Sequence, residues 1–365
     1  MSATCATVLC MRLLPNPGEL PPDPRSPDPS PVLNEAVSVI WRDTDTVQLE
    51  LGQHRVVLSG PEVAMAVETL RHPDRAHRST DERIVATLEA AGLLAPARPR
   101  PTPGTSAPLW ADRNALAVRH GAQADQVLRR RQQARVLVSG RSRLAATVAS
   151  TLAAGGIGRV AIAASGEVSA ADRCPGGATA TDEGTSRQVA AVLAARQQAP
   201  ASRVSGWQPA EPIDLVVLVD SPASAAEAAR PWHERGVPQL LASVDGTHAV
   251  VGPFVLPGRS SCVRCTDLHR CDRDPDWPML AVQLAGASRP RYATDVSLCV
   301  AAAGLTAGQA LEHLDGGSPT TVNGTVEWLL PDWRLRRRSW PPHAQCACGA
   351  ALPAGTRQNE DVRAR

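Results

Sequence analysis

The sequence predicts an α/β protein with two domains: a small winged helix-turn-helix domain, then a larger α/β domain whose C-terminal lobe is tied together by cysteines. Three observations lead to this prediction. Apolar residues recur at strand period and then at helix period within residues 36–95. A strand, a glycine turn, a helix and a second strand follow one another over 134–163, which is a βαβ unit. Two close pairs of cysteines stand downstream.

Length and composition bound the class of protein. The chain has 365 residues, of which 43% are hydrophobic. This length exceeds what a single hydrophobic core usually supports. It has no run of about 18 apolar residues, and Arg12 interrupts the short apolar start, so we expect a cytoplasmic protein with no membrane partner. All 38 basic residues are arginines, and the net charge is +2. This charge is too small to give the whole protein the positive potential that nucleic-acid-binding proteins use. Nine cysteines in such a chain favour thiols and metal over disulfides.

Proline-rich stretches separate the patterned regions and give the expected boundaries. We expect the following order: a disordered tail over 1–35, the winged-helix domain over 36–95, a linker over 96–109, the large domain over 110–349 and a second disordered tail over 350–365.

The small domain is predicted to contain three short antiparallel strands followed by helices. SVIWR, TVQLEL and HRVVLSG have strand patterns, with turns at 43–45 and 52–53. One helix is expected after Pro61, and a second is expected behind a capping box formed by Ser79 and Glu82.

Three uses of a winged helix are open. DNA binding is disfavoured because the last helix carries Asp81, Glu82 and Glu89, which repel phosphate. The domain could also do no more than pack against its neighbour. Peptide recognition is the third use, because an exposed edge strand can accept a partner strand. The candidate peptide-binding residues are Val56, Val57 and Leu58 on the edge, with Ile84 and Leu88 beneath or beside it.

The large domain is predicted to be Rossmann-like, with a degenerate phosphate loop. A helix is expected around 114–133, and further strands at 214–219, at 238–242 and after the turn at 245–246. Of the G-x-G-x-x-G/A pattern only Gly140 remains, Ala145 is tolerable at the third position, and Ser142 brings a Cβ where phosphate must approach. Arg141 and Arg143 are either phosphate ligands or surface charges.

The cysteines allow two chemistries. Cys262 and Cys265 form a Cys-x-x-Cys pair, and Cys346 and Cys348 follow a hairpin whose turn is expected at Asn323-Gly324. Zinc prefers four such ligands, whereas a redox pair needs a thiolate favoured by a helix N-terminus, and a helix-like segment follows Cys265. The tight Cys-x-Cys spacing keeps three substitute ligands open: His343, His269 and Cys271. Cys174 has no paired spacing, and Cys299 lies in an apolar helix as an expected core residue.

The order of these features resembles the ThiF/MoeB-like, ubiquitin-activating-type superfamily. Over residues 38–349 the chain is more closely similar to actinobacterial proteins described as TOMM (thiazole/oxazole-modified microcin) precursor leader-peptide-binding or bacteriocin-biosynthesis cyclodehydratase-domain proteins. The segments that carry the resemblance are WRDTDTVQLEL, RHGAQADQVLRRR, VVGPFVLPGRSSCVRCTDLHRCDRDPDWP and WPPHAQCACG.

The resemblance implies a protein that captures the leader of a ribosomally made peptide and presents it to a separate YcaO-type cyclodehydratase, which uses ATP to form azolines. It implies one structural zinc on the four cysteines and makes a homodimer plausible. Adenylating members carry carboxylates where this chain has Ala164 and Gly166, so ATP and Mg²⁺ are not expected as cofactors. Asp220 does match a family aspartate. The alternative is therefore an ATP-dependent adenylyltransferase that acts on a peptide or small-protein carboxylate, with Asp220 as its catalytic residue.

Overall fold

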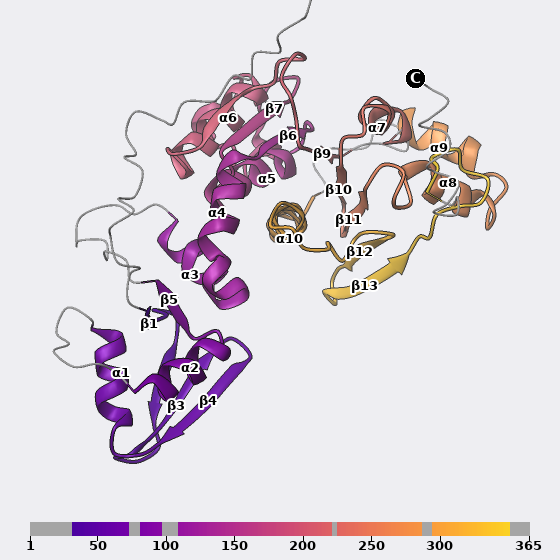
Figure 1. Cartoon of the computed structure of the whole chain (residues 1–365). Coiled ribbons are helices and arrows are strands. Elements are labelled where there is room, and N and C mark those ends of the chain that lie inside the picture. The colour runs from indigo at the N-terminus through magenta and orange to yellow at the C-terminus, as the bar shows by residue number, and fades with distance from the viewer. Residues whose placement is uncertain (1–30, 73–80, 97–108, 221–224, 287–293, 351–365) are drawn as a thin grey trace, which may run out of the picture. The chain divides into compact units, whose positions relative to one another are not determined.

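The computed structural model describes residues 31–72, 81–96, 109–220, 225–286 and 294–350 (Figure 1). The chain divides into two compact units, residues 1–100 and 101–365. The division falls within the stretch that the sequence analysis assigned to a linker, 96–109. No helix among the described residues combines the length and the apolar character needed to cross a membrane.

The small unit contains a three-stranded antiparallel sheet, a two-stranded one and two helices. The strands are β1 (Pro31–Leu33), β2 (Ser38–Trp41), β3 (Thr46–Leu51), β4 (His54–Ser59) and β5 (Leu94–Pro96), and the helices are α1 (Val63–Arg71) and α2 (Glu82–Ala90). The sheets have the orders β2-β3-β4 and β1-β5. The three predicted strands and both helices are confirmed, and the assignment of the unit as a winged helix-turn-helix stays a prediction.

Two local details of the small unit differ from the sequence-based expectation. Residues 31–33, expected in the disordered tail, form β1 because they pair with β5 and bury Leu33. Helix α2 is capped by Asp81, whose carboxylate accepts a hydrogen bond from the N–H of Arg83 at 2.8 Å. Asp81 lies one residue before the helix, where an N-cap must lie, and Ser79 of the expected capping box is outside the described residues.

The large unit is built on one mixed sheet with the strand order β13-β12-β11-β10-β9-β6-β7-β8. Strands β10, β9, β6, β7 and β8 run parallel to one another, while β11, β12 and β13 continue the sheet from β10 with antiparallel pairing. The strands are β6 (Arg135–Ser139), β7 (Arg159–Ala163), β8 (Arg203–Gly206), β9 (Leu215–Val219), β10 (Gln239–Asp245), β11 (His248–Val255), β12 (Gly324–Leu329) and β13 (Arg334–Ser339).

Helices cover both faces of this sheet because its central strands are apolar on both sides. Their bounds are α3 (Trp110–His120), α4 (Ala124–Gln133), α5 (Arg143–Ala154), α6 (Arg187–Gln198), α7 (Ala225–Glu234), α8 (Val263–Cys271), α9 (Trp277–Gly286) and α10 (Val296–Leu314). On β6, Val136 and Val138 share a core with α5, α6 and α10, whereas Leu137 faces α7 and α8. The predicted βαβ unit is confirmed as β6-α5-β7.

Two predictions for the large unit were wrong in detail. The single helix expected over 114–133 is two helices, because Gly121 adopts φ +53° and turns the chain between α3 and α4. The hairpin turn is not at Asn323-Gly324 but at 330–333, between β12 and β13. Asn323 has φ +53° and instead accepts a hydrogen bond from the N–H of Ser261 at 2.8 Å, which ties the start of β12 to the cysteine loop.

Candidate functional site

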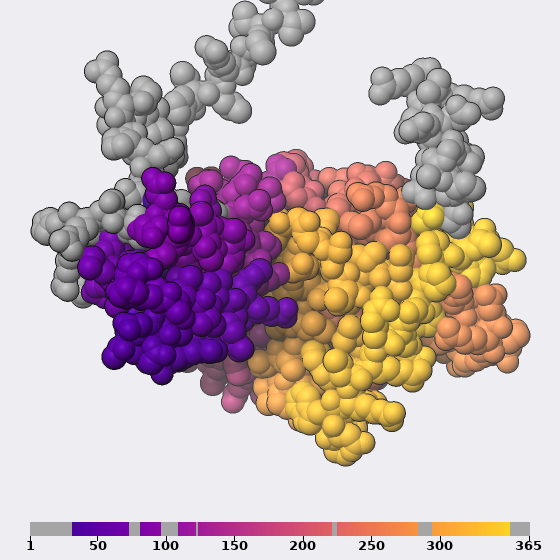
Figure 2. All heavy atoms as spheres, turned by 60° about the horizontal axis from the view of Figure 1, so that its bottom comes forward, coloured from indigo at the N-terminus to yellow at the C-terminus, as the bar shows by residue number. Residues whose placement is uncertain are grey.

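The four cysteines of the two predicted pairs come together in one cluster. Cys262 is the N-cap residue of α8, Cys265 lies in the first turn of that helix, and Cys346 and Cys348 lie in the stretch after β13. Their sulfur atoms all lie within 4.8 Å of one another. The yellow C-terminal stretch lies against the orange α8–α9 region in both overall views (Figure 1 and Figure 2).

The distances within the cluster fit a tetrahedral metal site. The Sγ–Sγ separations are 3.8 Å for Cys262–Cys265, 3.6 Å for Cys262–Cys346 and 3.6 Å for Cys265–Cys348. Four sulfurs at about 2.3 Å from zinc are about 3.8 Å apart, whereas a disulfide bond is about 2.05 Å long. Cys262, Cys265 and Cys346 are buried. The cluster is therefore consistent with a structural zinc whose four positions are all filled by protein.

The three substitute ligands do not join the cysteine cluster. His343 accepts the N–H of Gln345 on Nδ1 at 3.1 Å, which puts its proton on Nε2, and Nε2 donates to Asp272 at 2.9 Å. His269 is paired with the carbonyl of Pro341 at 2.9 Å. Both histidines therefore hold the loop that carries Cys346, while Cys271 is outside the metal-type groupings of the described residues.

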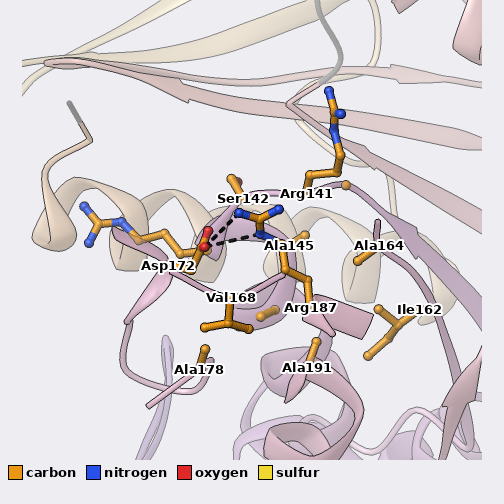
Figure 3. Close-up of a pocket in the computed structure, with 13 residues that line it drawn as sticks. Arg141, Ser142, Ala145, Ile162, Ala164, Val168, Asp172, Ala178, Arg187 and Ala191 are labelled. Atoms are coloured by element: carbon orange, nitrogen blue, oxygen red, sulfur yellow. Dashed lines mark hydrogen bonds and ion pairs between the residues drawn. The ribbon is translucent and has the colours of Figure 1, made fainter. Parts of the chain in front are cut away.

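A second site lies where the degenerate glycine loop was predicted, at the carboxyl ends of β6 and β7 (Figure 3). Gly140 is required there, since a Cβ would come within 2.7 Å of the Cβ and 2.8 Å of the carbonyl oxygen of Val219. The loop and α5 supply Gly140, Arg141, Ser142, Arg143, Ala145 and Ala146, and facing segments supply Ile162, Ala164, Val168, Asp172, Ala178, Arg187 and Ala191. The free space between these residues is about 20 Å³, roughly one water molecule, whereas ligand pockets are typically about 300 Å³ or more.

An ion pair that the sequence analysis missed fills part of this pocket. Arg187, the first residue of α6, donates from Nη2 at 2.9 Å and from Nε at 3.2 Å to Asp172 (Figure 3). Gly166 has φ +87°, and a Cβ there would lie 2.5 Å from Nη1 of Arg187. The two residues are 15 apart with no repeat or motif between them, so only the fold brings them together. A cationic guanidinium and small residues stand where the resemblance implied carboxylates.

Asp220 lies beside the predicted phosphate loop. It directly follows β9 and has φ +51°, and the hydroxyl of Ser142 donates to its carboxylate. Ser142 is the N-cap of α5 and also accepts the N–H of Leu144 at 3.2 Å. Burial raises the pKa of the Asp220 carboxyl to about 6, against the opposing hydrogen bond from Ser142. With this pKa the Asp220 carboxyl is still mostly ionised at pH 7 and becomes protonated below about pH 6.

In the small unit, β4 is an edge of the three-stranded sheet, as the candidate peptide site requires. Val57 is 42% exposed, and Val56 and Leu58 are half-buried. Ile84 and Leu88 are 7% and 0% exposed, so they lie in the core and do not line an exposed surface beside β4.

The hairpin register tells which backbone groups of β4 face the free edge. Leu51 pairs with His54 across a two-residue loop whose first residue, Gly52, has φ +60°. Residues that flank such a loop form a hydrogen-bonded pair, and such pairs alternate along the ladder. His54, Val56 and Leu58 therefore bond to β3. The N–H and C=O groups of Arg55, Val57 and Ser59 point outward.

Comparisons with known proteins identify the fold. No protein-family model matches the chain, and no curated protein sequence matches it. Solved structures do match: E. coli MccB with MccA-N7isoASN has a TM-score of 0.65 at 14% identity over 88% of this chain and 99% of that one. MccB with ATP matches at TM-score 0.63 and 14% identity, covering 87% and 99%. PaaA matches at TM-score 0.62 and 17% identity, covering 85% and 100%. The chain therefore shares the fold of MccB and PaaA, an α/β fold with a mixed central sheet.

Proposed function

We propose that this protein is a non-catalytic partner that binds the leader of a ribosomally made precursor peptide and presents it to a YcaO-type, ATP-dependent cyclodehydratase for azoline formation. The observation that carries the proposal is the free edge of β4, where Arg55, Val57 and Ser59 direct backbone donors and acceptors outward. An extended peptide can pair with such an edge whatever its side chains.

Side chains along this edge would contact the bound peptide and so distinguish one peptide sequence from another. Val57 and Ile40 lie on the same face of the sheet, on either side of Gln48, and are 42% and 45% exposed. Arg55 stands next to them and pairs with Glu50 at 2.8 Å. A strand added beside β4 would therefore lie next to the exposed Val57 and the Arg55–Glu50 pair. MccB, whose fold this chain shares, has been solved in complex with N-formylated MccA.

The large unit supports the non-catalytic part of the proposal. Nucleotide chemistry needs several positioned charges around phosphates and metal. In this chain Arg187 and Asp172 satisfy each other within the pocket, and Ala164 and Gly166 carry no carboxylate. The zinc lobe offers no open coordination position either, because four thiols complete a tetrahedron.

The first test is a calorimetric titration of the zinc-loaded protein with Mg·ATP. We expect no heat of binding up to millimolar ATP. Micromolar binding would contradict the proposal, since Arg141, Arg143 and Asp220 would then have replaced the missing carboxylates.

The second test measures binding of fluorescent synthetic precursor leader peptides to variants at the β4 edge. Val57→Pro removes an outward N–H, so we expect at least a tenfold loss of affinity. Val57→Thr keeps the N–H and the β-branched shape and should bind within about twofold of the parent. Circular dichroism and zinc content would verify that both variants fold. Equal binding by a folded Val57→Pro protein would rule out strand addition at this edge.

One observation favours a second candidate, an adenylyltransferase that activates a peptide or small-protein carboxylate. Asp220 stands at the end of β9 in a left-handed conformation, and strained backbone of this kind gathers at functional sites. The same fold has also been solved as MccB with ATP. Exchange of labelled pyrophosphate into ATP that Asp220→Asn abolishes would support this candidate. Absence of pyrophosphate exchange with every leader peptide would contradict this candidate and leave leader binding as the proposed function.

A further inference from the structure

The last strand of the large sheet, β13, is an open edge. It pairs with β12 on one side and is the outermost strand of the sheet (Figure 1). Every residue of β13 is exposed except Arg338, which is half-buried. A strand of this kind presents a row of unpaired N–H and C=O groups, with which another extended chain can pair.

The hydrogen bonds at the end of β13 tell which backbone groups face the open side. The N–H of Trp340 donates to the carbonyl of Asn323 at 2.8 Å, so these two residues form a hydrogen-bonded pair just beyond the ladder. Such pairs alternate along an antiparallel ladder. The bonds to β12 therefore come from the even-numbered residues of β13. The N–H and C=O groups of the odd-numbered residues point outward, and these residues are Leu335, Arg337 and Ser339.

The side chains of β13 carry positive charge and no acidic group, since its sequence is RLRRRS. Two of the arginines are occupied: Arg338 pairs with Glu327 at 2.8 Å, and Arg337 donates to backbone carbonyls of the loop before β12. Arg334 and Arg336 have no hydrogen-bond or ion-pair partner among the described residues. Because side chains alternate along a strand, these two unpaired arginines project from the same face of the sheet.

Exposed apolar side chains lie beside the unpaired arginines. Leu335, on the other face of β13, is 60% exposed, and Leu329 and Trp333 at the hairpin end are 51% and 45% exposed. Leu335 stands opposite Trp328, which packs against the main core of the large unit. An apolar side chain placed next to Leu335 would therefore extend that core to the edge of the sheet.

Both ends of β13 are held in place before anything binds. At one end the strand is joined to β12 through the hairpin. At the other end Trp340 is 3% exposed and donates from Nε1 to the hydroxyl of Thr325 at 3.0 Å. The cysteine cluster then follows with Cys346 and Cys348. A partner that adds to an ordered edge loses less binding free energy to the ordering of that edge.

The charge on β13 selects among possible occupants. Two antiparallel copies of β13 would place arginine opposite arginine in every register centred on Leu335, Arg336 or Arg337, and like charges directly opposite are destabilising. Charge on an edge protects a sheet against such self-pairing, but it leaves pairing with an acidic strand open. A nucleic acid would use the arginines and leave the outward backbone groups and Leu335 without a role.

We propose that the β13 edge is a docking site for an extended acidic segment of a partner protein, which adds to the sheet as a further strand. Carboxylates at alternate positions of that segment pair with Arg334 and Arg336, and the apolar residues between them lie beside Leu335. The site belongs to the large unit, whereas the proposed leader site is β4 of the small unit, so either can hold without the other.

The test measures fluorescence anisotropy of labelled synthetic peptides with the zinc-loaded full chain. The probe is a peptide as long as β13 that alternates Glu and Val, and the control peptide has Lys in place of Glu. We expect saturable binding of the first and none of the second. Val57→Pro should bind the Glu/Val peptide as well as the parent does, because β4 is not involved. No binding of the Glu/Val peptide would overturn the proposal.

N-methylated peptides test backbone pairing without changing the protein. In an antiparallel arrangement the Val residues face Leu335 and Arg337 as hydrogen-bonded pairs. N-methylation of every Val should then abolish binding, while N-methylation of every Glu should be tolerated. A parallel arrangement reverses the two results and also supports strand addition. Equal binding by both N-methylated peptides would show that no strand is added.

Charge reversal tests the arginines. The double variant Arg334→Glu, Arg336→Glu should bind the Glu/Val peptide at least about tenfold more weakly and should gain binding of the Lys/Val peptide. The matched control is Arg129→Glu with Arg203→Glu, two exposed arginines elsewhere in the large unit, which changes the net charge equally and should stay within about twofold of the parent. Circular dichroism and zinc content verify folding.

Two results would contradict the assignment of this edge. Equal weakening by the two double variants would mean that the peptide responds to net charge rather than to β13. Binding of labelled oligothymidylate that the Arg334→Glu, Arg336→Glu protein loses, without binding of the Glu/Val peptide, would assign the arginines to nucleic acid.

Discussion

The cysteine cluster and the glycine-loop pocket are both assembled from distant segments of the large unit. They differ in whether the side chains that would bind a ligand are present. The cluster has all four ligands at metal-type spacing. The pocket keeps its scaffold, with Gly140 packed on Val219 and Ser142 capping α5, but its space is occupied by the Arg187–Asp172 pair. When a metal ligand changes in a site that holds the fold together, the whole protein loses stability. A pocket, in contrast, can lose the side chains that bind a ligand and still keep its packing.

The largest effect is expected at the cysteine cluster. Cys265→Ser removes the 0% exposed sulfur, so the protein should lose its zinc and much of the ordering of the C-terminal stretch. Zinc sites contribute on the order of 10 kcal/mol in small zinc peptides. We expect metal analysis to give one zinc per parent chain and none in the variant, together with a clear fall in melting temperature.

Cys271→Ser is the matched control for that experiment, and it should keep both the zinc and the melting temperature. A Cys265→Ser protein that retained zinc would mean that His343 or His269 can act as a ligand after all.

The next effect is expected at the buried ion pair between α4 and α10. Arg131 donates from Nε and Nη2 to Asp315 at 2.7 and 2.6 Å, and the two side chains are 5% and 0% exposed. Arg131→Met leaves the buried carboxylate with only the more distant Arg119, whose Nη1 lies 4.0 Å from Oδ2 of Asp315. Removing one partner of a buried pair costs about 3–5 kcal/mol. Denaturant unfolding should report this loss. The double variant with Asp315→Leu should recover a large part of it, and no recovery would mean that the loss comes from packing.

A smaller effect is expected from the titration of Asp220. Its pKa is raised to about 6 in the folded state, so the folded state favours the protonated form. Stability from this group is full below about pH 4, its unfolded pKa, and is lost as pH rises through 6. Asp220→Asn should remove this loss and make the protein about 2 kcal/mol more stable at pH 7.

Thermal unfolding between pH 4 and pH 7 measures that difference. Asp172 is the internal comparison. Although burial opposes the shift, hydrogen bonds from Arg187 lower its pKa, so its contribution is present at neutral pH and is lost in acid. A pH profile of Asp220→Asn that parallels the parent would show that the carboxyl is not desolvated.

The smallest effect is expected when the pocket is emptied. The side chains of Arg187 and Asp172 are 15% and 14% exposed, and we expect Arg187→Ala to cost about 1 kcal/mol. The variant should still give no calorimetric signal with Mg·ATP, because Ala164 and Gly166 supply no carboxylate. If Mg·ATP bound to this variant and not to the parent, Arg187 alone would be blocking an otherwise competent nucleotide site.

Local patterns in the sequence were sufficient for the elements that depend on neighbours in the chain. The β6-α5-β7 unit follows from its apolar strands and glycine turns, and β2, β3 and β4 follow from their alternation. The start of β12 did not, because Asn323 adopts φ +53° to bond Ser261 rather than to turn a hairpin. That choice depends on a residue 62 positions away.

The sequence by itself determined which residues can ligate metal, which glycine must lie in the phosphate loop and which strand carries Val57, since spacing and side-chain chemistry are local properties. The tertiary structure alone decided that the four sulfurs lie within 4.8 Å of one another and that Arg187 meets Asp172 in the pocket. These pairs come from chain segments without a shared motif. Their contact results from strand order and from burial against a common core.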